Sequence, residues 1–142
     1  MSARLFRTKS EEETIAAGEQ LARALPSRAT VLLIGNLGAG KTTLAKGIVK
    51  GLGAASPEDV SSPTFTLIHE YGEAPKVYHI DLYRIDTARE LESLGLDEML
   101  EQEAVVLVEW GERFPQVWPA ERIEVRLEAL ENGVREIRVG GA

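Results

Sequence analysis

The sequence contains no cysteine, which excludes disulfide bonds, thiolate zinc sites and a cysteine nucleophile. It also lacks long hydrophobic segments, because its longest apolar runs, residues 29–34 and 104–108, are far shorter than the roughly 20 residues that cross a bilayer. The first ten residues have no apolar stretch of the kind found in a secretory signal. We therefore expect a cytoplasmic protein that makes no membrane contact.

Basic residues are also scarce, since 16 lysines and arginines stand against 23 aspartates and glutamates, a formal net charge of −7. Such a chain is a poor counter-ion for nucleic acid, whose binding depends on neutralising phosphates. If RNA is involved, we expect a partner to hold it. The 142 residues, 44% hydrophobic and 27% charged, suit one domain spanning residues 1–142.

Hydrophobic patterning predicts an α/β protein. Ser10 and Glu13 form a capping box at the start of a predicted helix that ends before Pro26. Further helices are predicted at 42–52 and at 87–103, the second with a break at Gly95. Strands are predicted at 30–34, 64–71, 77–82 and 104–108. A terminal hairpin is predicted at 123–130 and 134–139, with its turn at Asn132-Gly133. This order favours a three-layer, P-loop NTPase-like domain whose mainly parallel central sheet is flanked by helices, with its ligand at the carboxyl ends of the strands.

The motif that carries most chemical information is Gly-Asn-Leu-Gly-Ala-Gly-Lys-Thr at residues 35–42, which satisfies G-x-x-x-x-G-K-[ST] between a predicted strand and a predicted helix. Backbone N–H groups in such a loop bind phosphates, and Gly35, Gly38 and Gly40 permit the close approach. Lys41 is expected to reach the terminal phosphates and the Thr42 hydroxyl to bind Mg²⁺. No N-K-x-D or L-S-G-G-Q element is present, so ATP or ADP is the expected nucleotide.

Two carboxylates are candidates for the remaining site chemistry. Asp81 and Glu109 each follow an apolar predicted strand, where P-loop proteins place a carboxylate beside the magnesium shell. One would order the metal's water shell and the other orient the attacking water, and the pattern does not say which. Thr64 is interpreted either as a switch threonine or as an ordinary residue at the start of a strand. His69 and His79 lie within predicted strands and are interpreted as structural.

In combination these motifs resemble the TsaE family, also called YjeE, ATPases required for threonylcarbamoyl-adenosine formation in bacterial tRNA. The resemblance spans about residues 10–110 and leaves 128–142 unassigned. It rests on Gly35-Asn-Leu-Gly-Ala-Gly-Lys-Thr-Thr43, Ser62-Pro-Thr-Phe-Thr-Leu67, Val77-Tyr-His-Ile-Asp-Leu-Tyr-Arg84, Glu90-Leu-Glu92, Gly95-Leu96 and Leu107-Val-Glu-Trp110.

The resemblance implies roles for individual residues. Thr42 and Glu109 would bind Mg²⁺, Asp81 and Thr64 would complete the hydrolytic site, and Glu11 would lie beside the nucleotide. The phosphates would be held by Gly38, Ala39, Gly40, Lys41, Thr42 and Thr43. It also implies weak ATP hydrolysis coupled to TsaB and TsaD, where TsaD transfers the threonylcarbamoyl group to the adenosine beside the anticodon, so that tRNA is met through the complex.

Two other function classes are compatible with the same loop. A small-molecule kinase would need a lid with arginines, for which Arg113 and Arg122 are the candidates. A non-catalytic nucleotide-binding module would engage partners through residues 86–103, where seven carboxylates stand against Arg89 alone. Phosphorylation of an added acceptor would favour the first alternative, and the absence of hydrolysis with partners present would favour the second.

Overall fold

The computed structural model describes residues 3–64 and 66–141. Its strands form a seven-stranded mixed sheet in the order β1-β7-β6-β2-β5-β4-β3. Their bounds are Arg4–Thr8 (β1), Ala29–Ile34 (β2), Ile68–Tyr71 (β3), Lys76–Asp81 (β4), Ala104–Glu109 (β5), Ile123–Ala129 (β6) and Arg135–Gly141 (β7). Phe65, part of the Ser-Pro-Thr-Phe motif, lies outside the described residues.

The centre and the edges of the sheet differ in direction. Strands β6, β2, β5 and β4 run parallel to one another, whereas β1 with β7, β7 with β6, and β3 with β4 are antiparallel. The prediction of a mainly parallel sheet therefore holds for the four central strands, whereas the edge strands are antiparallel to their neighbours, and the antiparallel pair of β6 and β7 is the predicted terminal hairpin. Short turns join β3 to β4 and β6 to β7, and such turns can only produce antiparallel neighbours.

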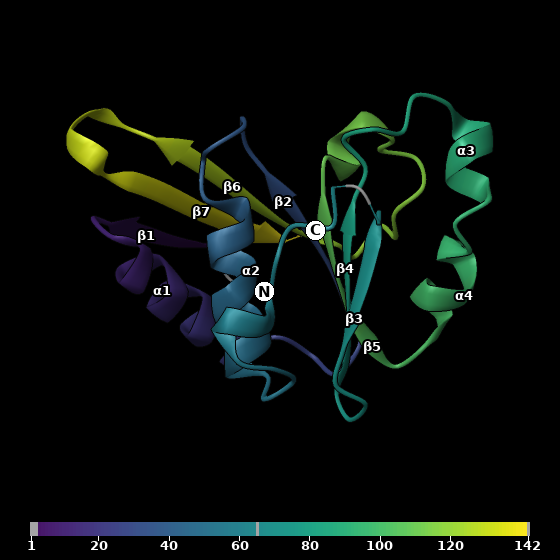
Figure 1. The fold of residues 1–142 in the computed structure, drawn as a ribbon, viewed down its shortest axis with the longest axis horizontal. Coiled ribbons are helices and arrows are strands. Elements are labelled where there is room, and N and C mark those ends of the chain that lie inside the picture. The colour runs from purple at the N-terminus through teal and green to yellow at the C-terminus, as the bar shows by residue number, and fades with distance from the viewer. Residues whose placement is uncertain (1–2, 65, 142) are drawn as a thin grey trace.

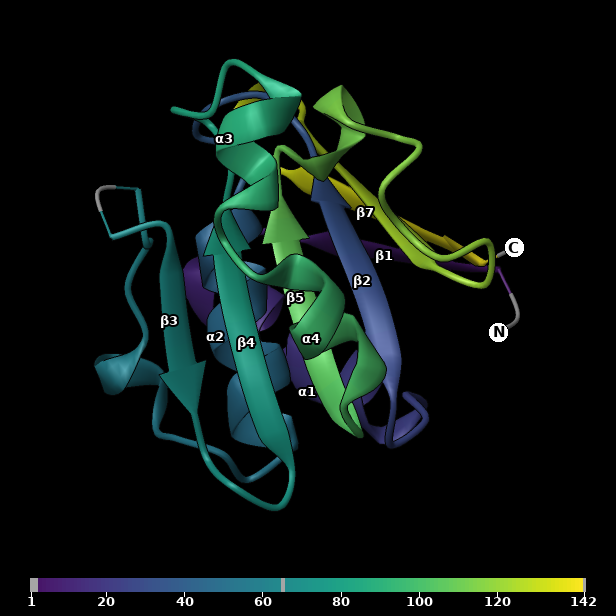
Figure 2. The ribbon, with the colours of Figure 1, turned by 90° about the vertical axis from the view of Figure 1, so that its right-hand side faces the viewer.

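Helices cover both faces of the sheet (Figures 1 and 2). Helices α1 (Glu11–Arg23) and α2 (Lys41–Gly51) lie on one face, and the shorter α3 (Ala88–Glu92) and α4 (Leu96–Glu101) lie on the other. The predicted cap and break are confirmed, because the Ser10 hydroxyl accepts from the Glu13 N–H and Gly95, at φ 74°, separates α3 from α4. Single 3₁₀ turns occur at Pro57–Asp59, Gly111–Arg113 and Glu131–Gly133.

Helices α1 and α2 approach each other closely because glycines line their contact. A Cβ added to Gly47 would collide with the Ile15 carbonyl group, and one added to Gly18 would lie 2.6 Å from the Leu44 carbonyl oxygen. Buried Leu21 and Ile48 complete this layer against the sheet. The helix that follows the glycine-rich loop is thus held against both α1 and the sheet.

The remaining predictions of secondary structure hold in most places. The terminal hairpin turns at Asn132 and Gly133, both with positive φ, as expected of this dipeptide. The predicted strand from Thr64 begins only at Ile68, because Leu67 has a φ of 72° that interrupts extended backbone. Strand β1 was not anticipated from the pattern. Within residues 3–64 and 66–141, no helix has the length and apolar character needed to cross a membrane.

Candidate functional site

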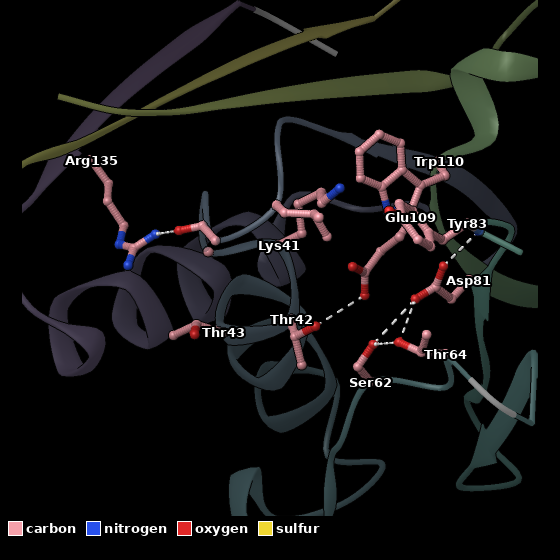
Figure 3. A pocket seen from close by; sticks show the side chains of 13 residues that line it. Lys41, Thr42, Thr43, Ser62, Thr64, Asp81, Tyr83, Glu109, Trp110 and Arg135 are labelled. Carbon is pink, nitrogen blue, oxygen red and sulfur yellow. Dashed lines mark hydrogen bonds between the residues drawn. The ribbon is translucent and has the colours of Figure 1, made fainter.

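A cavity of about 330 Å³ opens at the carboxyl ends of β2, β4 and β5 (Figure 3). Its size lies at the lower end of the roughly 300–1,000 Å³ of small-molecule sites. Five segments that are distant in sequence meet there. The lining residues are Leu37, Gly38, Gly40, Lys41, Thr42, Thr43, Ser62, Thr64, Asp81, Tyr83, Glu109, Trp110 and Arg135.

The glycine-rich loop forms one wall of the cavity and leads directly into α2. Gly38 and Gly40 have φ values of 79° and 102°, which side-chain-bearing residues rarely adopt. Gly40 is the N-cap of α2, so the unpaired N–H groups of the first turn and the positive end of the helix dipole lie beside the cavity. This wall is suited to an anion.

Lys41 begins α2 and is almost fully buried. Its Nζ donates to the Gly35 carbonyl at 2.7 Å and lies 3.6 Å from the centroid of the Trp110 ring. Burial lowers the pKa of Lys41, while the nearby Glu109, Glu112 and Asp81 carboxylates act in the opposite direction. A phosphate group placed in the cavity would give this desolvated ammonium a charged acceptor in place of the Gly35 carbonyl.

Glu109 ends β5 and accepts two hydrogen bonds on one oxygen. Its Oε2 lies 3.2 Å from the Thr42 hydroxyl, which donates, and 2.6 Å from His79 Nε2. Glu109 is 4% exposed and His79 is fully buried. Both histidines were interpreted as structural, but His79 contacts the candidate site residue Glu109. His79 and Asp81 are two positions apart on β4, so their side chains share one face of the strand. This spacing is the sequence signal that could have identified His79.

Asp81 ends β4 and pairs with Glu109 in the register of β4 and β5. Its Oδ2 accepts from the Thr64 hydroxyl at 3.0 Å and from the Ser62 hydroxyl at 3.2 Å, and its Oδ1 accepts from the Tyr83 N–H at 2.8 Å. The two candidate carboxylates thus have different partners. Asp81 joins the loop before β3 to the cavity, whereas Glu109 joins α2 to the sheet.

Several lining residues were missed from sequence. Arg135, in the unassigned tail, donates from Nη1 to the Gly38 carbonyl at 2.7 Å. Tyr83 lies with its ring centroid 5.1 Å from that of Trp110, on the rim of the cavity. Ser62 was quoted only as part of a motif. No local pattern identifies Arg135, because its contact with the loop depends on β7 lying near the loop in the folded chain.

Other candidates lie apart from the cavity. Glu11 is exposed at the start of α1 and does not line it. Ala39 is buried in the core, and Gly35 meets the site through its carbonyl bond to Lys41. The two arginines considered for a lid are engaged elsewhere, Arg113 with the Leu82 and Tyr83 carbonyls and Arg122 with Glu124.

The side chains at the cavity fit Mg²⁺ better than a metal ion whose ligands must all come from protein side chains. In the described part of the chain, no three His, Asp or Glu side chains gather closely enough to hold a metal ion by themselves. One hydroxyl, Thr42, adjoins Glu109, with Asp81 on the neighbouring strand. Mg²⁺ commonly uses one or two carboxylates and takes its other ligands from water and substrate phosphates.

Comparison with known proteins finds similarity over nearly the whole chain. Residues 8–137 match the family described as "Threonylcarbamoyl adenosine biosynthesis protein TsaE". The tRNA threonylcarbamoyladenosine biosynthesis protein TsaE of Bacillus subtilis is 40% identical over 93% of this chain and 82% of its own length. That of Treponema pallidum is 36% identical over 93% and 96%. A crystal structure of Bacillus subtilis YdiB superimposes with a TM-score of 0.78 and 33% identity, covering 97% of this chain and 84% of that one.

Proposed function

Because the chain belongs to the TsaE family of threonylcarbamoyl adenosine biosynthesis proteins, we propose that it is a Mg²⁺-dependent P-loop ATPase required for threonylcarbamoyl-adenosine modification of tRNA. The observation that carries this proposal is the meeting of Lys41, Thr42, Asp81 and Glu109 around one cavity beside a glycine-rich loop. The proposal treats residues 1–142 as a single ATPase domain.

The phosphates of ATP would lie along the glycine-rich loop and the first turn of α2. In the structure the Lys41 ammonium donates to the Gly35 carbonyl, so phosphate binding would exchange a neutral acceptor for a charged one. Charge-assisted hydrogen bonds are about twice as strong as neutral ones, which favours this exchange. Thr43 and the N–H groups from Gly38 onward would complete the phosphate contacts.

Thr42 and Glu109 would hold Mg²⁺, which when bound neutralises charge on the phosphates. The Thr42 hydroxyl donates its hydrogen to Glu109, so its lone pairs remain available for a cation. Asp81, near the same shell, and Thr64 would orient the attacking water. Phosphoryl transfer is mainly a matter of positioning and charge neutralisation, so these residues need no covalent role.

Hydrolysis would be weak alone and would be used with TsaB and TsaD homologues, which hold the tRNA and carry out the transfer. The charge balance of −7 supports this division, since the chain is a poor phosphate-neutralising surface. On this proposal the protein contributes ATP turnover to the complex and does not itself transfer the threonylcarbamoyl group.

The test measures ATP turnover and tRNA modification with the chain, TsaB and TsaD homologues combined. We expect turnover to rise when the partners are added and modification to require the chain. Glu109→Ala should reduce hydrolysis more than nucleotide affinity, and Lys46→Ala, on α2 but outside the cavity lining, is the matched control. Turnover and modification that are unchanged by mixing the three proteins would refute the proposal.

A further inference from the structure

His79 has an unusual environment for a histidine in the middle of a strand. It is fully buried, and its neighbours on the same face include the apolar Val77 on β4 and Leu107, its register partner on β5. Its Nε2 lies 2.6 Å from Glu109 Oε2, whereas its Nδ1 has no partner in residues 3–64 and 66–141. The ring thus directs its one polar contact to a carboxylate of the cavity.

The orphan Nδ1 indicates where the ring hydrogen lies. A buried N–H without an acceptor is rarer in proteins than a buried acceptor without a donor. The neutral ring with hydrogen on Nε2 leaves a bare lone pair on Nδ1 and lets Nε2–H donate to the carboxylate. A histidine kept only for packing would not need a buried, unpaired nitrogen, because an apolar side chain of similar size would fill the same space.

The carboxylate of Glu109 is restrained by the two bonds at Oε2. The ring of His79 donates from β4 and the Thr42 hydroxyl donates from α2, so two rigid elements fix the same oxygen. A glutamate side chain otherwise rotates about several bonds and would lose that freedom when a ligand binds. Oε1 lies outside both bonds, on a side chain that lines the cavity.

We propose that His79 is a positioning residue that fixes the orientation of Glu109 for the bound cation, and that it acts only through this carboxylate. The proposal rests on the proposed function, because the cation belongs to the Mg²⁺–nucleotide complex. Partners that orient a metal-binding side chain typically contribute about 10- to 100-fold to metal affinity. The dependence of nucleotide affinity on Mg²⁺ is therefore the quantity that His79 should control.

The test compares ADP affinity by calorimetry with Mg²⁺ and with EDTA. His79→Leu removes the donor, whereas His79→Gln keeps an N–H near the position of Nε2. His69→Leu is the matched control, because His69 lies directly opposite on β3 and bonds to the Ser61 carbonyl and Tyr71 instead. We expect His79→Leu to lose about tenfold in affinity with Mg²⁺, with no comparable loss in EDTA, and His79→Gln to recover most of it.

Each further result supports or overturns the inference. In a Glu109→Gln background, His79→Leu should add no further loss, and an additive loss would overturn it. Equal losses of affinity with Mg²⁺ and with EDTA would also overturn it, since they indicate general damage to the fold.

Nitrogen NMR of the unsubstituted protein tests the position of the ring hydrogen without any variant. A hydrogen on Nδ1 of His79 would contradict its assignment to Nε2. If the unsubstituted protein binds no nucleotide with Mg²⁺, the proposed function itself fails, whereas normal binding with an insensitive His79→Leu refutes the inference alone.

Discussion

The two sides of the cavity are built differently. Lys41, Thr42 and Glu109 belong to the first turn of α2 and the end of β5, and Lys41 and Glu109 are 5% and 4% exposed. Opposite them, Ser62 and Thr64 belong to irregular chain before β3 and reach the site through hydroxyl bonds to Asp81 (Figure 3). One side is part of the packed sheet and helix, and the other is a loop whose Ser62 and Thr64 hydroxyls are bonded to Asp81.

This difference suggests a division of labour. Groups on packed elements are held in place before a ligand arrives, which favours binding. Hydrogen bonds at the surface of a loop are exchanged more easily, and Leu67, with its φ of 72°, shows that this loop is held in a conformation rare for leucine. We therefore expect substitutions on the packed side to change nucleotide affinity or stability, with Glu109 also affecting hydrolysis through the metal, and those on the loop side to change hydrolysis alone.

The largest effect is expected from Lys41→Met. Nucleotide affinity should fall by about 100-fold, because a charge-assisted contact to phosphate contributes roughly 1.5–3 kcal/mol. Stability of the empty protein should not fall with it, since burial lowers the pKa of Lys41 and its charged form is disfavoured in the fold. The unsubstituted protein should gain stability as the pH rises through that lowered pKa toward 10.5, and the variant should lack this gain.

Chemical denaturation at several pH values and nucleotide titration of the same samples would measure both effects of Lys41→Met. A variant that bound nucleotide normally would contradict the importance of the packed side. A variant that lost stability would contradict the burial argument.

Gly47→Ala tests whether the packed side depends on the contact between α1 and α2. The added methyl group would collide with the Ile15 carbonyl, and overpacking of this kind costs about 1–3 kcal/mol. Gly140→Ala is the control, because its Cβ would meet no atom within 4 Å. Urea unfolding that showed equal stability for the two variants would mean that α2 can move away from α1 without penalty.

Thr64→Ala tests the loop side. The variant loses one hydroxyl bond to Asp81 and, on the proposed function, a group that orients the attacking water. We expect hydrolysis to fall by about tenfold, because one hydrogen bond contributes roughly 1.5 kcal/mol and about 1.4 kcal/mol changes a rate tenfold, while nucleotide affinity stays close to normal. Thr66→Ala removes an exposed hydroxyl of the same segment and should change neither rate nor affinity. A large loss of affinity in Thr64→Ala would remove the distinction between the two sides.

The smallest effect is expected from Glu136→Gln, on β7 outside the cavity. A hydrogen bond from Arg138, aided by Arg7, lowers the pKa of Glu136 below its ordinary value of 4.5. Its contribution to stability is therefore present above that value and is lost as the pH falls through the lowered pKa. The variant should unfold in acid with a slightly weaker pH dependence and bind nucleotide normally. An altered affinity would mean that β7 influences the site through Glu136 as well as through Arg135.

Local patterns in the sequence were sufficient for much of the architecture. The glycine-rich loop, the Ser10 cap, the break at Gly95 and the turn at Asn132 each depend on neighbouring residues, and each is found where it was predicted. Lys41, Thr42, Thr64, Asp81 and Glu109 were named as site candidates, and they line one cavity. Parallel strands end at the same edge of a sheet, so strand-end residues could be brought together without knowing the strand order.

Contacts between segments that are distant in sequence could not be predicted from local sequence patterns. The β1 strand is short and at the edge, and its pairing with β7 joins the two ends of the chain. Arg135 reaches Gly38 only because that pairing and β6 bring the tail beside the loop. The bond from His79 to Glu109 depends on β4 and β5 being neighbours. No residue pattern specifies such adjacency when the strand order is unknown.

The place of β2 in the sheet affects how the protein matures on the ribosome. This strand is made early, yet its neighbours β5 and β6 are made only when residues 104–129 emerge. Until then both its edges carry unpaired N–H and C=O groups, which invite pairing with other chains. The strand that leads into the glycine-rich loop therefore acquires its two partners only after β5 and β6 have been made, and a nascent chain that stalls before β5 exposes an aggregation-prone segment.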